Sequence, residues 1–121
     1  MMTGSVSGRR ALVPVTLRIS GQPDLTIEFV LDTGFGGFLT LPPAAVARLA
    51  LPFRYRIPSG LADGSQVMVA VHVAAIIWHG VERRTEVIAT GKQPLLGAAL
   101  LDGHDLAIRF ADGGPVTNQR F

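Results

Sequence analysis

The residues best suited to chemistry form a short run, Asp32, Thr33 and Gly34, with two more glycines close behind. Residues 27–31 before them are almost all apolar and should lie in the core. A carboxylate next to such a segment is costly unless it is paired or hydrogen-bonded. Thr33 adds a hydroxyl, and the glycines let the backbone approach closely. The run predicts either a catalytic aspartate at a strand end or an aspartate that hydrogen-bonds its own turn.

The elements around this run are predicted mainly from alternating hydrophobicity. Residues 11–20 and 25–31 read as two strands joined by a Gly-Gln-Pro-Asp turn, and so as a hairpin. Further strands are expected at 38–41, 53–57, 67–78, 81–89, 106–110 and 116–121, a short helix at 44–49, and a strand end with one helical turn at 95–101. About eight strands with one or two short helices predict a mainly β domain, closed or sandwich-like.

The length of 121 residues suits one domain. Residues 1–10 begin with a Gly- and Ser-rich stretch and are expected to be a flexible N-terminus, with a single domain over residues 11–121. The 48% hydrophobic content argues against disorder. The low charged content of 17% leaves room for an apolar interface, which fits an oligomer.

Composition also excludes several classes of function. The net charge of +2, without a run of basic residues, argues against nucleic-acid binding. The absence of cysteine excludes disulfide scaffolds, thiolate zinc sites and cysteine nucleophiles. No apolar stretch approaches the roughly 20 residues of a membrane span, so a cytoplasmic protein is expected, without membrane partners. No cofactor or metal is implied.

Other candidate residues favour structural roles. His72, His79 and His104 share no metal-ligand spacing, so they are interpreted as structural or surface histidines. Asp63, in an Ala-Asp-Gly-Ser stretch, could be a second catalytic carboxylate but is more typical of a turn. Asp102 and Asp105 are interpreted as turn residues as well.

Two segments together resemble a known family. Residues 29–34, Phe-Val-Leu-Asp-Thr-Gly, resemble the aspartic protease signature. Leu95, Leu96 and Gly97 before a helical turn resemble the second signature of the retropepsin-like branch. The order of hairpin, Asp-Thr-Gly loop, second hairpin and Leu-Leu-Gly matches over roughly residues 12–110. Phe35 and the Leu-Thr-Leu-Pro-Pro stretch at 39–43 look most like the small single-domain bacterial and archaeal proteins of this clan.

The resemblance implies a small closed β-barrel of the retroviral-protease type, dimeric about a two-fold axis. Asp32 would be catalytic, Thr33 would hydrogen-bond across the two-fold axis, and Gly34 would leave room for substrate. A flap that closes over an extended peptide would have its tip at Gly60, Leu61, Ala62, Asp63 and Gly64. The alternative for this segment is an ordinary β-turn. Phe35 stands where many members have a small residue or a hydroxyl, and it is a candidate for an apolar subsite.

The chemistry of peptide hydrolysis explains why a dimer is expected. One carboxylate takes a proton from water, and a second, protonated carboxyl polarises the scissile carbonyl. A chain with one Asp-Thr-Gly can supply both only by pairing Asp32 with its own copy in a homodimer. The function expected is an aspartic endopeptidase acting on a peptide or protein substrate. The alternatives are a catalytically weak dimeric module for peptide binding or assembly, and a β-barrel with a chance Asp-Thr-Gly, which predicts no such dimer.

Overall fold

The structure is a computed structural model that describes residues 1–121. It contains ten strands and two short helices. The strands are β1 (Met2–Ser7), β2 (Arg10–Arg18), β3 (Leu25–Asp32), β4 (Leu39–Leu41), β5 (Phe53–Gly60), β6 (Gln66–Trp78), β7 (Val81–Ala89), β8 (Leu95–Gly97), β9 (His104–Ile108) and β10 (Pro115–Arg120); the helices are α1 (Pro43–Arg48) and α2 (Ala98–Leu101). Neither helix is long and apolar enough to cross a membrane.

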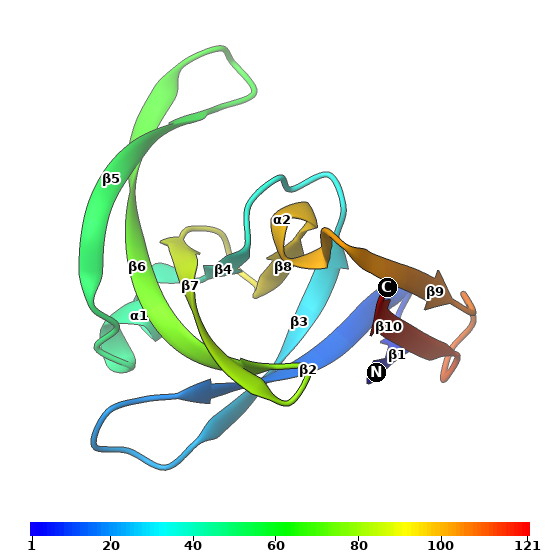
Figure 1. Cartoon of the computed structure of the whole chain (residues 1–121). Coiled ribbons are helices and arrows are strands. Elements are labelled where there is room, and N and C mark those ends of the chain that lie inside the picture. The colour runs from blue at the N-terminus through cyan, green and yellow to red at the C-terminus, as the bar shows by residue number, and fades with distance from the viewer.

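Six of the strands close into a barrel in the order β6-β7-β4-β8-β3-β2, and a pairing between β6 and β2 joins the ends (Figure 1). Two neighbouring pairs, β3 with β8 and β4 with β7, are parallel, whereas the other barrel pairs are antiparallel. This closure confirms the mainly β, small closed barrel that the sequence predicts.

The barrel core follows from the alternation within its strands. In β2, Ala11, Val13, Val15 and Leu17 are buried, whereas Pro14 between them is exposed. Side chains in a strand point to opposite faces in turn, so each second residue enters the core. Phe29 of β3, which is 0% exposed, packs in the same cluster. The same alternation was the basis for predicting these strands from the sequence.

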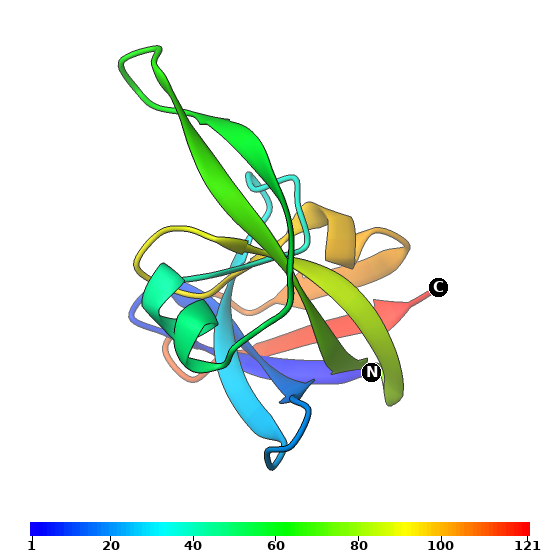
Figure 2. The same ribbon diagram turned by 90° about the vertical axis from the view of Figure 1, so that its left-hand side faces the viewer.

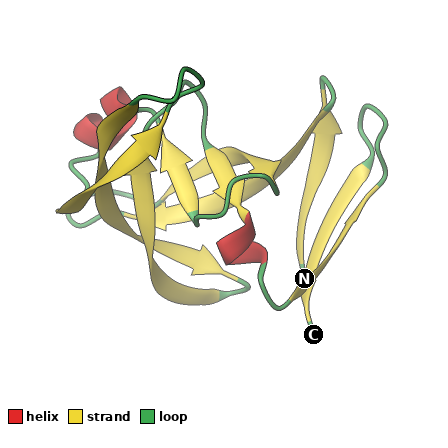
Figure 3. Ribbon diagram, turned by 90° about the horizontal axis from the view of Figure 1, so that it is seen from above, coloured by secondary structure: helices red, strands yellow, loops and turns green.

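The sheet continues beyond the barrel as β2-β1-β10-β9, so that the first and last strands lie side by side (Figure 3). The expected flexible N-terminus over residues 1–10 is therefore wrong. β1 pairs with both β2 and β10, and Val6 is buried. The small residues that resembled a flexible tail have a packing role, because a side chain at Gly4 would overlap the carbonyl oxygen of Leu12.

The hairpin of β5 and β6 projects away from the barrel (Figure 2). β6 pairs with β7 only from Ala70 onward, whereas its first residues, from Gln66 to Val69, pair with β5 alone. The predicted second hairpin is thus confirmed, and both of its strands are longer than expected at the tip. One half of β6 belongs to the barrel wall and the other half to the projecting arm.

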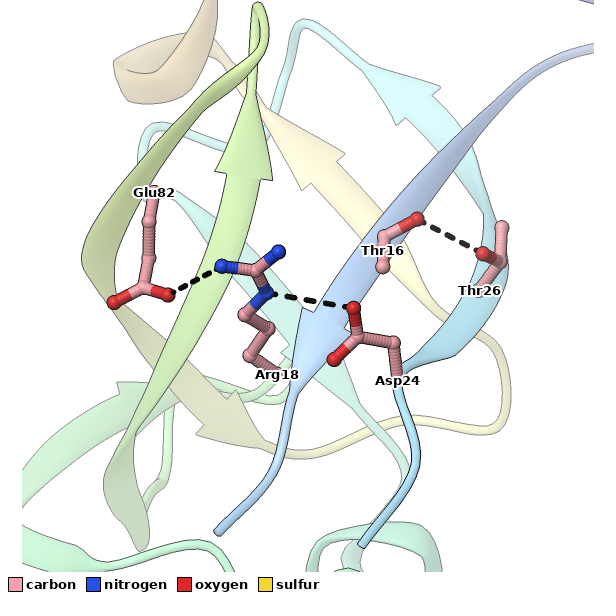
Figure 4. A network of polar contacts seen from close by, with 5 residues as sticks. All are labelled: Thr16, Arg18, Asp24, Thr26 and Glu82. Atoms are coloured by element: carbon pink, nitrogen blue, oxygen red, sulfur yellow. Dashed lines mark hydrogen bonds and ion pairs between the residues drawn. The ribbon is translucent and has the colours of Figure 1, made fainter.

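A small polar network lies where β2 and β6 close the barrel (Figure 4). Arg18 donates to Asp24 at 3.4 Å and to Glu82 of β7 at 3.1 Å. The hydroxyl groups of Thr16 and Thr26, which face each other across β2 and β3, are 2.9 Å apart. Because the ion pairs are half exposed, they contribute little to stability. Closure therefore depends chiefly on strand pairing and the apolar core.

Replacing Gly4 with alanine tests whether β1 is part of the folded domain. We expect Gly4→Ala to lower the free energy of unfolding by about 1–3 kcal/mol, because the added methyl group forces β1 away from Leu12. Urea denaturation measures this change. Gly60→Ala is the matched control, since its methyl group meets nothing within 4 Å, and its effect should stay within about 0.5 kcal/mol. Equal stabilities of the two variants would contradict an integral β1.

Candidate active site

Asp32 is the last residue of β3 and is half-buried. Its Oδ1 accepts a hydrogen bond from the Gly34 backbone N–H at 3.0 Å, and its carbonyl accepts one from the Phe35 N–H at 3.1 Å. Its other carboxylate oxygen, Oδ2, makes no hydrogen bond within the chain. The arrangement is that of an aspartate held by its own turn, with one oxygen left available.

The Asp-Thr-Gly segment lies beside the Leu-Leu-Gly segment. β3 and β8 pair in parallel, with Leu31 opposite Leu96 and Asp32 opposite Gly97. Parallel strands end at the same edge of a sheet, so the two following segments meet there. The two segments that resemble the family signatures are therefore direct neighbours in the barrel wall.

Three hydrogen bonds tie the loop after Asp32 to the start of α2. The N–H groups of Gly97, Ala98 and Ala99 donate to the carbonyl oxygens of Phe38, Phe35 and Gly37 at 2.8, 2.8 and 3.1 Å. The first N–H groups of a helix have no partner within the helix and need one elsewhere. Here the loop supplies those partners, which fixes the position of the loop relative to Asp32.

The ring of Phe35 packs against two glycines. A Cβ atom at Gly37 would lie 2.6 Å from Cζ of Phe35, and one at Gly97 would lie 2.5 Å from its Cδ2. A Cβ at Gly97 would also overlap the Gly37 carbonyl oxygen. Phe35 therefore supports the loop from within, and this contact requires glycine at both positions. Its role as an apolar subsite stays a prediction.

Thr33 and Gly34 are exposed at the outer surface of the loop. The Thr33 hydroxyl has no hydrogen-bond partner within the chain. A Cβ at Gly34 would lie 3.3 Å from Oδ1 of Asp32, so a larger residue would crowd the carboxylate. Both residues are free to meet a second molecule, but their expected roles there stay predictions.

The predicted flap tip is a tight turn that joins β5 to β6. The Leu61 N–H donates to the Ser65 carbonyl at 2.8 Å, and Gly64 has a φ of 86°, which favours glycine. Oδ1 of Asp63 accepts from the Ser65 hydroxyl at 2.5 Å and from the Ser65 N–H at 2.9 Å. These two bonds, the hydroxyl first, lower the pKa of Asp63. Asp63 is thus a turn residue, as the sequence favours.

The hairpin tip and the Asp32 loop lie at the same end of the barrel (Figures 1 and 2). Three apolar side chains near the tip are exposed: Leu61 (48%), Val67 (43%) and Met68 (61%). An arm with exposed apolar residues and a strand edge is suited to contact an extended peptide. The hairpin is confirmed, and its action as a flap stays a prediction.

None of the five surface hollows of the chain is lined by Asp32. The largest, about 690 Å³, lies among Phe38, Phe53, Arg54 and Arg83 instead. Small-molecule sites are usually enclosed clefts. In the single chain, Asp32 therefore lies outside the surface hollows.

The histidines are arranged in two ways. His72 has a structural contact, with Nδ1 at 2.8 Å from the Leu51 carbonyl oxygen. The rings of His79 and His104, in contrast, lie side by side, with centroids 4.8 Å apart and planes tilted by 36°. The sequence did not reveal this pair, because His79 lies in the β6–β7 turn and His104 begins β9, and only the long-range pairing of strands brings them together. No three His, Cys, Asp or Glu side chains gather in a way that could hold a metal ion.

Replacing Gly97 with alanine tests how the loop is held. We expect Gly97→Ala to cost about 1–3 kcal/mol of stability, since the methyl group meets both the Phe35 ring and the Gly37 carbonyl. It should also speed hydrogen exchange of the Ala98 and Ala99 amides, measured by NMR. Gly36→Ala, in the same loop but with open space around it, is the control and should leave both quantities unchanged. Unchanged exchange in both variants would show that the glycine contact does not hold the loop.

Compared with known protein families and with curated proteins, the sequence has no significant match. The likeness to retropepsin-like proteases therefore stays an expectation that rests on the motifs. A functional assignment has to come from the geometry around Asp32 itself.

Proposed function

We propose that the chain is an aspartic endopeptidase that works as a homodimer, with one Asp32 carboxyl from each subunit. One observation carries the proposal: Asp32 ends β3 beside Gly97 of β8, half-buried, in a loop fixed by three hydrogen bonds. A turn aspartate alone does not require so rigid a setting. A catalytic carboxyl does, because acid–base chemistry depends on exact placement.

The availability of one carboxylate oxygen supports the same function. Oδ1 is held by the Gly34 N–H, which leaves Oδ2 for water or for a second carboxyl. Two carboxylates about 3 Å apart cannot both ionise, so they share one proton and titrate as a unit. One then acts as base toward water and the other as acid toward the peptide carbonyl.

The second carboxyl has to come from another copy of the chain. Asp63, the alternative within the chain, is committed to Ser65 at the hairpin tip. The Asp32 loop, in contrast, has Thr33 and Gly34 exposed at its surface. A two-fold axis at this loop would place Asp32 beside its copy and would form the missing wall of a substrate cleft.

A second candidate function is a dimeric module that binds extended peptides without cleaving them. The exposed apolar side chains of the hairpin, Leu61, Val67 and Met68, favour it. The two functions share the fold and the dimer, and they differ only in whether Asp32 performs chemistry. A binding module would tolerate the loss of its carboxylate, whereas a protease would not.

Sedimentation equilibrium, followed by cleavage of a peptide library, tests the proposal. We expect a dimer at micromolar concentration and cleavage that falls at least about 100-fold in Asp32→Asn, because the amide cannot act as acid or base. The fold should survive, since an amide oxygen can still accept from the Gly34 N–H. Asp105→Asn, at an exposed position of β9, is the control and should remain active.

Three outcomes of that experiment would count against the proposal. A chain that stays monomeric with and without peptide lacks the second carboxyl. Equal cleavage by Asp32→Asn and Asp105→Asn would show that the activity does not depend on the Asp32 carboxyl. Peptide binding without cleavage, unchanged in Asp32→Asn, would favour the binding module.

Shortening the hairpin tests its role in substrate contact. We expect replacement of residues 61–65 by an Asn-Gly dipeptide to leave thermal stability nearly unchanged. Gly60 and Gln66 already face each other across the hairpin, and a two-residue turn can join them. Cleavage of extended peptides should nevertheless fall at least tenfold in kcat/KM, because the exposed tip is lost. Full activity of the shortened chain would rule out a flap.

A further inference from the structure

A second site is indicated far along the chain from Asp32, where the β6–β7 turn faces the ends of the last two strands. A hollow of about 450 Å³ lies there. Its lining includes Trp78, Arg83, Asp102, His104, Arg120 and Phe121. None of these residues belongs to the Asp32 loop or to the projecting hairpin.

The charges around this hollow are mainly positive. The ion pairs of the chain involve Arg18 and Arg54, so Arg83 and Arg120 have no acidic partner. Arg83 lies at the rim, with its guanidinium carbon 5.8 Å from the Phe38 ring centroid. Asp102 is the one acidic side chain in the lining, and it pairs with neither arginine. Two residues of the lining, Arg83 and Arg120, therefore carry a guanidinium group without an acidic partner, and that of Arg83 lies toward Phe38.

Two residues of the lining carry buried nitrogen atoms that lack partners. Nε1 of Trp78, a residue only 4% exposed, and Nε2 of His104 both make no hydrogen bond. Buried polar groups are nearly always paired, so such a group calls for water or a ligand.

The orientation of His104 leaves Nε2 for contact with a negative group, to which it can donate only when the ring is protonated. Its Nδ1 is 2.8 Å from the Asp102 carbonyl oxygen, which can only accept, so Nδ1 carries a hydrogen. The ring becomes a donor at Nε2 as well when it is protonated. Trp78 packs edge-on against both His79 and His104, with ring centroids 5.1 and 5.6 Å away, and holds the pair in place.

Burial and neighbouring positive charges disfavour a positive charge on His79. The pKa of His79 lies below its ordinary value because of burial first, then the charges of His104, the N-terminal amino group and Arg120. Burial disfavours a charge of either sign, whereas the neighbouring positive charges disfavour a cation and favour an anion.

We propose that this hollow binds a small oxyanion of the phosphate or carboxylate class, held by Arg120 and Arg83, with His104 and Trp78 as further donors. Guanidinium groups match the geometry of both oxyanions. The site is independent of the Asp32 chemistry, and its assignment would stand whether or not the chain is a protease.

Titration of the histidine rings by NMR tests the site. The probes are inorganic phosphate and, separately, succinate, at constant ionic strength. We expect either or both anions to raise the pKa values of His79 and His104 in a saturable way, and the tighter of the two identifies the class. His72 is an internal reference, because its Nδ1 faces the Leu51 carbonyl away from the hollow, and it should not move.

Variants give the matched comparison. Arg120→Gln should weaken binding at least tenfold, and Arg83→Gln should also weaken it. Arg109→Gln removes the same charge from an exposed position outside the hollow and should bind as the unmodified chain does. Thermal melts check that each variant is folded.

Several results would overturn the proposal. One is a change in the pKa values of His79 and His104 that does not saturate with added anion, and another is an equal change at His72. A third is an equal loss of anion binding in Arg120→Gln and Arg109→Gln. Each would indicate only general charge screening. Tight Zn²⁺ binding to His79 and His104, without any anion effect, would assign the pair to a metal instead.

Discussion

The arrangement around Asp32 depends on the parallel pairing of β3 with β8. This pairing joins segments about 65 residues apart and places Asp32 opposite Gly97 at one edge of the barrel. The loop after β3 then lies close enough for its carbonyl groups to accept from the first N–H groups of α2. This arrangement requires glycine at position 97, because the backbone of the Asp32 loop and the Phe35 ring leave no space for a Cβ atom.

Barrel closure divides β6 into a half that is packed in the barrel wall and a half that projects from it. β6 meets β2 and β7 over its second half, where Ala74, Ile76 and Trp78 enter the core. Its first half pairs only with β5 and exposes Val67 and Met68. Elements with few buried contacts open most readily. The same strand therefore both holds the barrel and presents an arm beside the Asp32 loop.

Local pattern predicted most of the fold, because alternation marks a half-buried strand wherever one face meets the core. It could not identify β1, since small residues in a sequence look the same whether they are flexible or closely packed against Leu12. At the candidate site, the Asp-Thr-Gly turn and the hairpin tip were predictable from local residues. The ring position of Phe35 and the contact between the His79 and His104 rings depend on tertiary structure, which no local spacing encodes.

If the dimer forms as proposed, its assembly and its chemistry are linked. In the single chain, Oδ1 of Asp32 is held by the Gly34 N–H, while Oδ2 is free of partners in the protein. Bringing two such carboxylates to within about 3 Å would place like charges together unless one proton is shared. Association would then take up a proton, and the proton gained on assembly is the one that the acid needs toward the scissile carbonyl. A barrel that exposes one well-placed carboxylate would thus acquire its acid–base pair only on dimerisation.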